Sequence, residues 1–327
     1  MAKTIVRNIC VTIFLLCLLT GISVPADSAR VPFTSEIRGV KGNGTIVFMS
    51  DIQSPLWFEK LAIRSDNNEE ATQFMLNRIG EDTSVVALFL LGDMVALGSF
   101  GSYWDDLYDK TAAVRNAHIP VFAAFGNHEY KPFESKGKEH FFETFPYIKS
   151  DWYSKRIKNI GIIILNSNFS RIDEGGQKEQ NRWYIETLKE FDRDSSVAVV
   201  IVGTHYPPYT NSKIIGPSEE VQEFFVEPFL QSKKAKVFLS GHAHTFEHFK
   251  NSGKDFFVIG GGGGLLHPLL QGKERRRKDI PAQTSERIFF HYLRTVLSPD
   301  SLSMRIMKLS PDRTRFDTLN ILNVGIN

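Results

Sequence analysis

The chain has 327 residues, of which 42% are hydrophobic and 26 are phenylalanine, so it is long and apolar enough for a substantial buried core. This composition excludes an intrinsically disordered chain. Lysine plus arginine (39) nearly balances aspartate plus glutamate (37), so the overall charge does not favour nucleic acid as a partner, and we expect no nucleic-acid-binding groove.

The first thirty residues have the order of a secretory signal peptide. Lys3 and Arg7 precede an apolar run at residues 9–19, and small residues follow at 26–29. We therefore expect residues 1–29 to be cleaved and residues 30–327 to form a single secreted or periplasmic domain. The alternative is an uncleaved membrane anchor. The run is shorter than the roughly 20 residues of a membrane-spanning helix, so no stable span is expected after cleavage.

Both cysteines, Cys10 and Cys17, lie in this predicted signal peptide. The mature chain would then contain no thiol. That excludes disulfides, a cysteine nucleophile and thiolate metal ligands.

From Thr45 onward, short apolar runs alternate with longer amphipathic stretches. Strands are predicted at 45–50, 85–91, 121–125, 161–166, 197–204 and 237–240, and helices at 69–79, 103–117, 179–191 and 219–231. The run at 85–91 is apolar throughout, which is typical of a strand covered on both faces. From about residue 256 the chain becomes mainly β, with strands at 256–259, 288–297 and 302–309. We predict an α/β fold, a four-layer sandwich of two mixed β-sheets flanked by helices.

Side chains that can bind a metal follow five of these predicted strands. They are Asp51 and Gln53, Asp93, Asn127 and His128, His205, and His242 and His244. In open α/β sheets, ligands bind at the carboxyl ends of the strands. Carboxylate, amide and imidazole groups together suit a divalent cation. One such residue is usually a helix cap or a surface residue, but five occurrences in one chain predict a metal site.

At these residues the chain resembles the calcineurin-like metallophosphoesterase superfamily. The pattern of that superfamily is D-x-H, G-D, G-N-H-(D/E), a single His and G-H-x-H, in this order. Residues 126–129 (GNHE) and 241–244 (GHAH) match in full, and the resemblance covers residues 45–264. Within the superfamily the chain resembles secreted, bacterial-type members related to purple acid phosphatases, although Ala96 stands where those enzymes carry a tyrosine ligand.

The resemblance implies a dinuclear metal centre. The first metal would be held by Asp51, Gln53, Asp93 and His244, and the second by Asp93, Asn127, His205 and His242. The bridging Asp93 and His128 would be the catalytic residues, with a metal-bridging hydroxide as nucleophile and His128 as general acid or as a stabiliser of phosphoryl charge. The residues expected near the substrate are Asn127, His128, Tyr206 and His267.

Two positions depart from the superfamily pattern. Gln53 replaces the usual histidine, and its neutral carbonyl oxygen favours Mn²⁺ or Fe²⁺, with Zn²⁺ as the alternative. Ala96 also occupies the position where protein phosphatases carry an aspartate that orients the catalytic histidine. The sequence therefore does not indicate what orients His128.

The resemblance implies an exported, metal-dependent phosphoesterase that acts on small phosphorylated substrates. Because no extended basic groove is visible, monoesters or nucleotides are favoured. A phosphodiesterase on the same metal core and a non-catalytic metal-binding protein on this scaffold stay open as alternatives. The basic run at residues 273–278 is interpreted as a solvated surface loop rather than a binding patch. The oligomeric state does not follow from the sequence.

Overall fold

The computed structural model describes residues 31–37, 44–56, 68–280, 288–298 and 301–325, and Phe33–Asn327 form one compact unit. The predicted signal peptide at residues 1–29 lies outside the described residues and stays a prediction. Among the residues that are described, no helix has the length and apolar character needed to cross a membrane.

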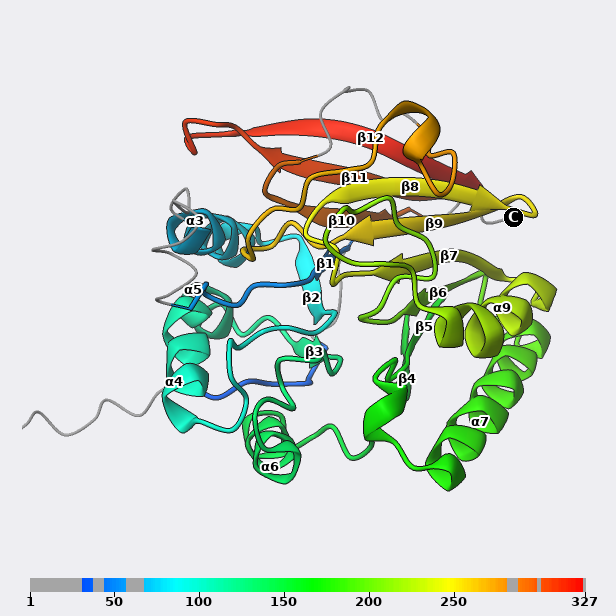
Figure 1. Cartoon of the computed structure of the whole chain (residues 1–327), viewed down its shortest axis with the longest axis horizontal. Helices are drawn as coiled ribbons and strands as arrows, with labels where there is room; N and C mark the ends of the chain where they lie inside the picture. Colours follow the sequence, from blue (N-terminus) through cyan, green and yellow to red (C-terminus); the bar gives the residue numbers. More distant parts are fainter. Residues whose placement is uncertain (1–30, 38–43, 57–67, 281–287, 299–300, 326–327) are drawn as a thin grey trace, which may run out of the picture. The chain divides into compact units, whose positions relative to one another are not determined.

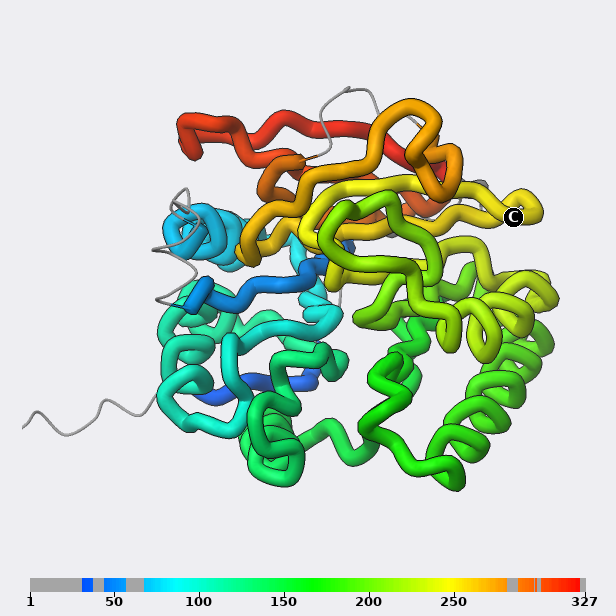
Figure 2. The backbone as a smooth tube through the Cα atoms, in the orientation of Figure 1, coloured from blue at the N-terminus to red at the C-terminus, as the bar shows by residue number. Residues whose placement is uncertain are grey.

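Two mixed six-stranded sheets pack face to face (Figure 1). In the first, with the order β12-β11-β10-β1-β2-β3, the parallel strands are β1 (Thr45–Met49), β2 (Val85–Leu90) and β3 (Val121–Ala123). Its antiparallel strands are β10 (His291–Leu297), β11 (Ser301–Leu309) and β12 (Phe316–Gly325). The strand order shows that the chain returns to the first sheet after completing the second. The returning segment is the orange to red end of the trace in Figure 2.

The second sheet has the order β4-β5-β6-β7-β9-β8. Its parallel strands are β5 (Ile160–Ile164), β6 (Val199–Gly203), β7 (Ala235–Ser240) and β9 (Lys254–Ile259). The edge strands β4 (Tyr153–Ile157) and β8 (Phe246–Asn251) run antiparallel to their neighbours.

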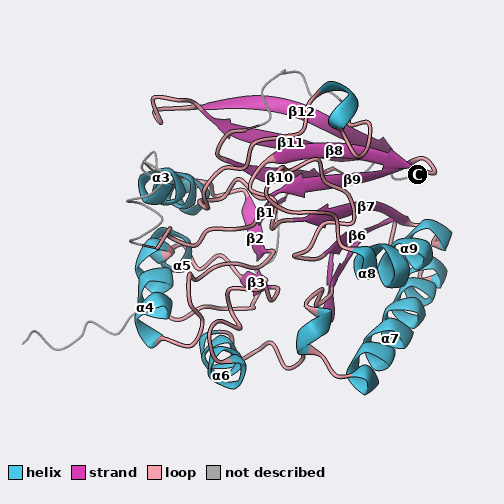
Figure 3. Cartoon of the chain, viewed as in Figure 1, coloured by secondary structure: helices cyan, strands magenta, loops and turns pink. Residues whose placement is uncertain are grey.

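Helices form the two outer layers (Figure 3). A core cluster joins the first sheet to α3 (Asn68–Glu81), α4 (Gly101–Lys110), α5 (Ala112–Asn116) and α6 (Glu134–Thr144). Another joins the second sheet to α7 (Glu174–Arg193), α8 (Glu219–Val221) and α9 (Glu227–Gln231). The predicted α/β sandwich of two mixed sheets flanked by helices is confirmed.

The central strands β1, β2 and β6 are almost entirely apolar because each of their faces meets a different core. In β1, Ile46 and Phe48 face the second sheet, whereas Val47 and Met49 face the helices. In β6 the same alternation places residues 199 and 201 between the sheets and residues 200 and 202 against the helices. Successive side chains of a strand point to opposite faces, so burial on both sides favours a nearly continuous apolar run.

Three strands that were not predicted, β4, β8 and β12, are all sheet edges. Their sequences mix charged and apolar residues, as in YSKRI of β4, which hides the apolar pattern. Helix α6 was also not predicted. The helix predicted at 103–117 divides at Thr111, whose hydroxyl donates to the Leu107 carbonyl oxygen (2.6 Å). The helix predicted at 219–231 widens into a π-helical turn at Gln222–Val226 just before Pro228, which has no N–H to donate.

Candidate metal centre

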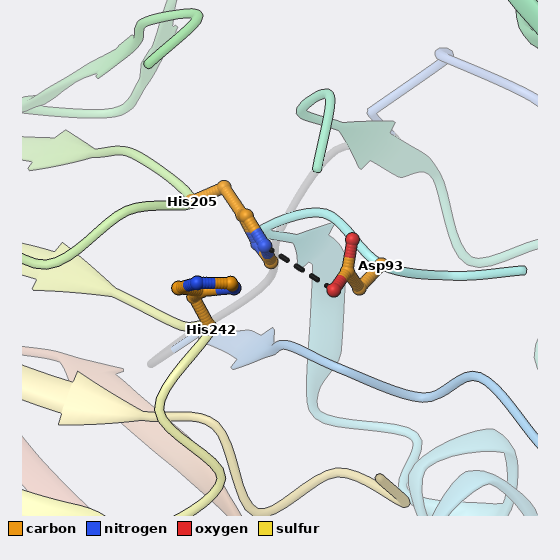
Figure 4. A group of neighbouring side chains, drawn as sticks. All are labelled: Asp93, His205 and His242. Atoms are coloured by element: carbon orange, nitrogen blue, oxygen red, sulfur yellow. Dashed lines mark ion pairs between the residues drawn. The ribbon is translucent and has the colours of Figure 1, made fainter. Parts of the chain in front are cut away.

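The predicted metal-binding side chains converge where strands of both sheets end. One oxygen or nitrogen atom from each of Asp93, His205 and His242 lies within 4.8 Å of the others, and the same holds for Asp51, Asp93 and His244. Figure 4 shows the first group, in which both imidazole rings approach Asp93 from separate segments of the chain. Asp93 belongs to both groups, which is the position that the sequence prediction gave to a bridging ligand.

Unusual backbone conformations occur at three of these residues. Asp51, Asp93 and His242 have φ values of 60°, 51° and 63°, in the left-handed region that side chains other than glycine rarely adopt. Gly126 allows the close approach that this geometry requires, because a Cβ atom there would lie 2.3 Å from the amide nitrogen of Asp93. The N–H of His242 in turn donates to both carboxylate oxygens of Asp51 (3.1 and 2.9 Å).

Backbone carbonyl groups hold the rings of His205 and His244. The Nδ1 atom of each ring lies within hydrogen-bond distance of one of them, Leu91 O for His205 (3.0 Å) and Leu265 O for His244 (2.7 Å). Nε2 of His205 is then 3.3 Å from Oδ2 of Asp93, and Nε2 of His244 is 3.3 Å from Oδ1 of Asp51. Donation from Nδ1–H fixes the tautomer and leaves Nε2 as the atom that can bind a metal.

The structure also shows what orients His128. Its Nδ1 lies 2.7 Å from the backbone carbonyl oxygen of Ala96, so the main chain at this position does what the alanine side chain cannot. Its N–H donates to Oδ1 of Asp93 (2.9 Å), and its Nε2 lies 3.9 Å from Oδ2 of the same carboxylate. His128 is therefore held beside both groups of candidate ligands without belonging to either.

The charges of the site fit a divalent cation. Burial by itself would raise the pKa of Asp93, but His205 and His128 lower it well below its ordinary value. Burial would likewise lower the pKa of His205, yet the Asp93 carboxylate raises it to about 9. Burial and the neighbouring His205 lower the pKa of His242 to about 2. An ionised carboxylate next to a neutral imidazole is a ready donor set, and a bound cation would replace the proton on His205.

Gln53 is buried at the rim of this cluster. Its amide nitrogen is placed to donate to the backbone carbonyl oxygens of Asp93 (2.7 Å) and Asp51 (3.2 Å). These two bonds use the donor side of the amide, so the carbonyl oxygen is the atom left to accept a hydrogen bond or bind a metal. Asn127 is the second amide among the candidate ligands, with its Oδ1 3.2 Å from Nε2 of His205.

Glu129 supports the site in a way that sequence reasoning missed, although it is the last residue of the quoted GNHE motif. Its fully buried carboxylate accepts hydrogen bonds from the N–H groups of Asp93 (3.0 Å), Met94 (2.7 Å) and Gly126 (2.7 Å). Burial and the charge of Asp93 raise the pKa of Glu129 to about 7. The acidic residue that ends this motif thus ties the end of β2 to the end of β3.

Replacing Glu129 by glutamine should destabilise the fold. The amide offers one acceptor oxygen and turns an NH₂ group toward backbone donors, so at least one buried N–H loses its partner. We expect the free energy of unfolding to fall by about 1–3 kcal/mol, measured by denaturant titration. The control, Glu139→Gln on the exposed face of α6, should change it by less than about 0.5 kcal/mol. Equal stabilities of the two variants would contradict this role of Glu129.

A cavity of about 420 Å³ opens beside these residues. Its lining residues include Gln53, Asp93, Asn127, His128, His242 and His244, together with several apolar side chains. Of the two further residues predicted to contact substrate, His267 lines the cavity and stacks on the ring of His244 (4.4 Å). Tyr206 packs against the ring of His242 (4.5 Å) and is not among the lining residues.

The fold and the site together define a two-sheet α/β sandwich with a cluster of metal-binding side chains at its strand ends. The model of the calcineurin-like phosphoesterase family matches residues 44–246, and the chain belongs to this family. It is 27% identical over 199 residues to probable purple acid phosphatase 20 of Arabidopsis thaliana. That match covers 54% of this chain and 45% of the plant protein, so the chain spans about half the length of this relative.

Two solved structures share the fold at low sequence identity. Purple acid phosphatase PPD1 from yellow lupin superposes with a TM-score of 0.63 at 17% identity, covering 90% of this chain and 55% of the plant protein. GAP50, described as the anchor in the inner membrane complex of Plasmodium, superposes with a TM-score of 0.55 at 13% identity, covering 86% and 90%. Because one of these proteins is described as a phosphatase and the other as an anchor, the fold alone does not establish catalysis.

Proposed function

We propose that this protein hydrolyses phosphate monoesters with two divalent cations held on either side of Asp93. The observation that carries the proposal is the sharing of Asp93 between two groups of candidate ligands, with His128 beside them. Membership of the calcineurin-like phosphoesterase family supports it.

The donor atoms present fit two cations. Asp51, Gln53, Asp93 and His244 would hold the first, and Asp93, Asn127, His205 and His242 the second. When bound, the two cations would supply positive charge for the phosphoryl oxygens and lower the pKa of a water for attack. The amide oxygen of Gln53 favours Mn²⁺ or Fe²⁺ over Zn²⁺ at the first position.

His128 would complete the chemistry with a proton. Because its Nδ1–H is held by the Ala96 carbonyl oxygen, Nε2 is the atom that exchanges protons with the cavity. A proton on Nε2 can be donated to the leaving alcohol oxygen, the step for which a positioned general acid is required. When no proton is needed, the same atom can still stabilise charge on the phosphoryl group.

A monoester is favoured over an extended polyanionic substrate because Lys131 is the one lysine or arginine among the residues that line the cavity. The test is hydrolysis of p-nitrophenyl phosphate and bis-p-nitrophenyl phosphate by protein reconstituted with Mn²⁺, Fe²⁺ or Zn²⁺. We expect the monoester to be the better substrate with Mn²⁺ or Fe²⁺. Preference for the diester would favour a phosphodiesterase, and binding of cations without turnover of either ester would favour a non-catalytic protein.

Replacing Gln53 by histidine should tighten the first metal position and move its preference from Mn²⁺ toward Zn²⁺, because imidazole is the better donor for Zn²⁺. Calorimetric titration of the metal-free parent and variant with each cation measures both the affinity and the metal preference. The second position should be unchanged, since its ligands are Asp93, Asn127, His205 and His242. Indistinguishable affinities in the two proteins would show that Gln53 does not contact a metal.

We also propose that the protein is exported, because Lys3, Arg7 and the apolar run that follows them have the order of a secretory signal peptide. N-terminal sequencing of the mature protein should begin between Asp27 and Val31. A product that retains Met1 inside the cell would contradict it.

A further inference from the structure

We propose that the preferred substrates are phosphomonoesters of apolar alcohols, and that Ile214 and Ile215 bind the alcohol. This inference rests on the proposed phosphatase function. It goes further by assigning the chemical class of the group to which the phosphate is attached.

The lining of the cavity combines candidate metal ligands with apolar side chains. The apolar residues include Pro55, Ile214, Ile215, Leu265, Leu266 and Pro268, and Leu265 adjoins the candidate ligands, since its carbonyl oxygen lies 2.7 Å from Nδ1 of His244. A phosphoryl group bound beside the candidate ligands would therefore have these apolar side chains available to contact the alcohol of its ester. Lys131 is the one lysine or arginine among the lining residues, and its intermediate exposure leaves it able to meet a phosphoryl oxygen.

Ile214 is unusually exposed for an isoleucine. It is 62% exposed, although most large apolar side chains of the described chain are buried. Single exposed apolar residues are common on protein surfaces, but this one lies in the wall of a cavity next to candidate catalytic groups. A bound apolar alcohol would cover the Ile214 side chain and so shield it from water. The hydroxyl groups of a sugar or of glycerol would find few side-chain partners on this wall.

Hydrogen bonds to Glu247 and from Arg276 hold the segment that carries Ile214 and Ile215 in place. Glu247, which is fully buried, accepts hydrogen bonds from the Thr210 hydroxyl (2.5 Å) and the N–H of Asn211 (2.7 Å). The guanidinium of Arg276 donates to three carbonyl oxygens of the same segment, Thr210 (3.2 Å), Ser212 (2.7 Å) and Ile215 (3.3 Å). The wall is therefore preformed before the substrate binds, which reduces the entropic cost of binding.

These contacts also revise the interpretation of the basic run at residues 273–278. Besides Arg276, Arg277 stacks over the ring of Tyr209 at 3.9 Å and donates to the Lys250 carbonyl oxygen. Two arginines of the run thus hold the segment at residues 209–215 rather than serving only as solvated surface. Arg276 and Arg277 therefore act as positioning residues, through the segment that carries Ile214 and Ile215.

The test compares ethyl phosphate with hexyl phosphate, whose leaving groups have the same chemistry but different apolar areas. We expect kcat/KM to be about tenfold or more higher for hexyl phosphate, because four additional methylene groups contact the wall. In Ile214→Ser this ratio should fall below about threefold. Since Ile214 is largely exposed, the melting temperature of the variant should match that of the parent.

Phe133→Ser is the matched control, because Phe133 is 65% exposed and does not line the cavity. Its hexyl-to-ethyl ratio should equal that of the parent. A ratio near one in the parent, or a ratio that Ile214→Ser leaves unchanged, would overturn the inference. Turnover of p-nitrophenyl phosphate separates this failure from failure of the proposed function: activity without chain-length preference rejects only the apolar wall, whereas no activity on any monoester rejects both.

Discussion

Asp93→Asn is expected to reduce kcat/KM for phosphomonoesters by more than about 100-fold, beyond the 10–100-fold typical of residues that only support metal ligands. The substitution keeps the shape of the side chain but removes the charge shared by the two groups of ligands. It also removes an acceptor, since Oδ1 of Asp93 accepts from the N–H of His128 while Oδ2 faces Nε2 of His205. Metal content, measured by mass spectrometry, should fall together with activity.

Asp255→Asn is a matched control for this variant. Asp255 is also a buried carboxylate paired with a histidine, with its Oδ1 2.7 Å from Nε2 of His248, but it does not line the cavity. Its replacement should leave metal content and activity at the level of the parent, even if it lowers stability. An Asp93→Asn protein that turns over substrate within threefold of the parent would show that Asp93 is not the shared ligand.

His128→Ala should slow hydrolysis by about 10²–10⁴-fold, the usual span for a general acid, while both metals stay bound. The loss should be larger for an alkyl phosphate than for p-nitrophenyl phosphate, because p-nitrophenolate leaves with little need for a proton. Steady-state kinetics with both esters, together with metal content, measure this difference. Equal losses for the two esters would indicate charge stabilisation instead of proton donation.

His140→Ala is the control for His128→Ala. The two histidine side chains are equally exposed, at 21% and 20%, but His140 pairs with Glu143 on α6, away from the cavity. Its replacement should leave both rates unchanged. If His128→Ala loses metal, then His128 is a ligand and the two groups of donors need revision.

The layers of the fold could be predicted from the sequence because the central strands β1, β2 and β6, which are buried on both faces, are almost entirely apolar. The edge strands β4 and β12 are mostly not buried and carry mixed sequences. The edge strand β8 is buried at residues 246–249 but includes the polar Glu247 and His248, so it shows no such pattern either. The candidate ligands could be predicted for a related reason. Each follows a strong strand, and glycines at positions such as 126 mark the points where the backbone passes close to another ligand.

The contacts that orient these ligands could not be predicted from side-chain identity. Every residue has a backbone carbonyl oxygen, so the identity of residue 96 carries no signal. Only the turn after β2 directs the Ala96 carbonyl oxygen toward the imidazole of His128. Glu129 was visible in its motif, but its role depends on N–H groups brought together from two strand ends. The support that Arg276 gives to Ile215 joins segments about sixty residues apart in the chain, which no local pattern reveals.

The most direct test of the central claim is the rate of p-nitrophenyl phosphate hydrolysis as Mn²⁺ is added stepwise to the metal-free protein. Because Asp93 belongs to two groups of ligands, we expect hydrolysis to be absent without metal, to rise with added cation and to reach its plateau at two equivalents per chain. A plateau at one equivalent, or full activity without metal, would contradict the two-cation account.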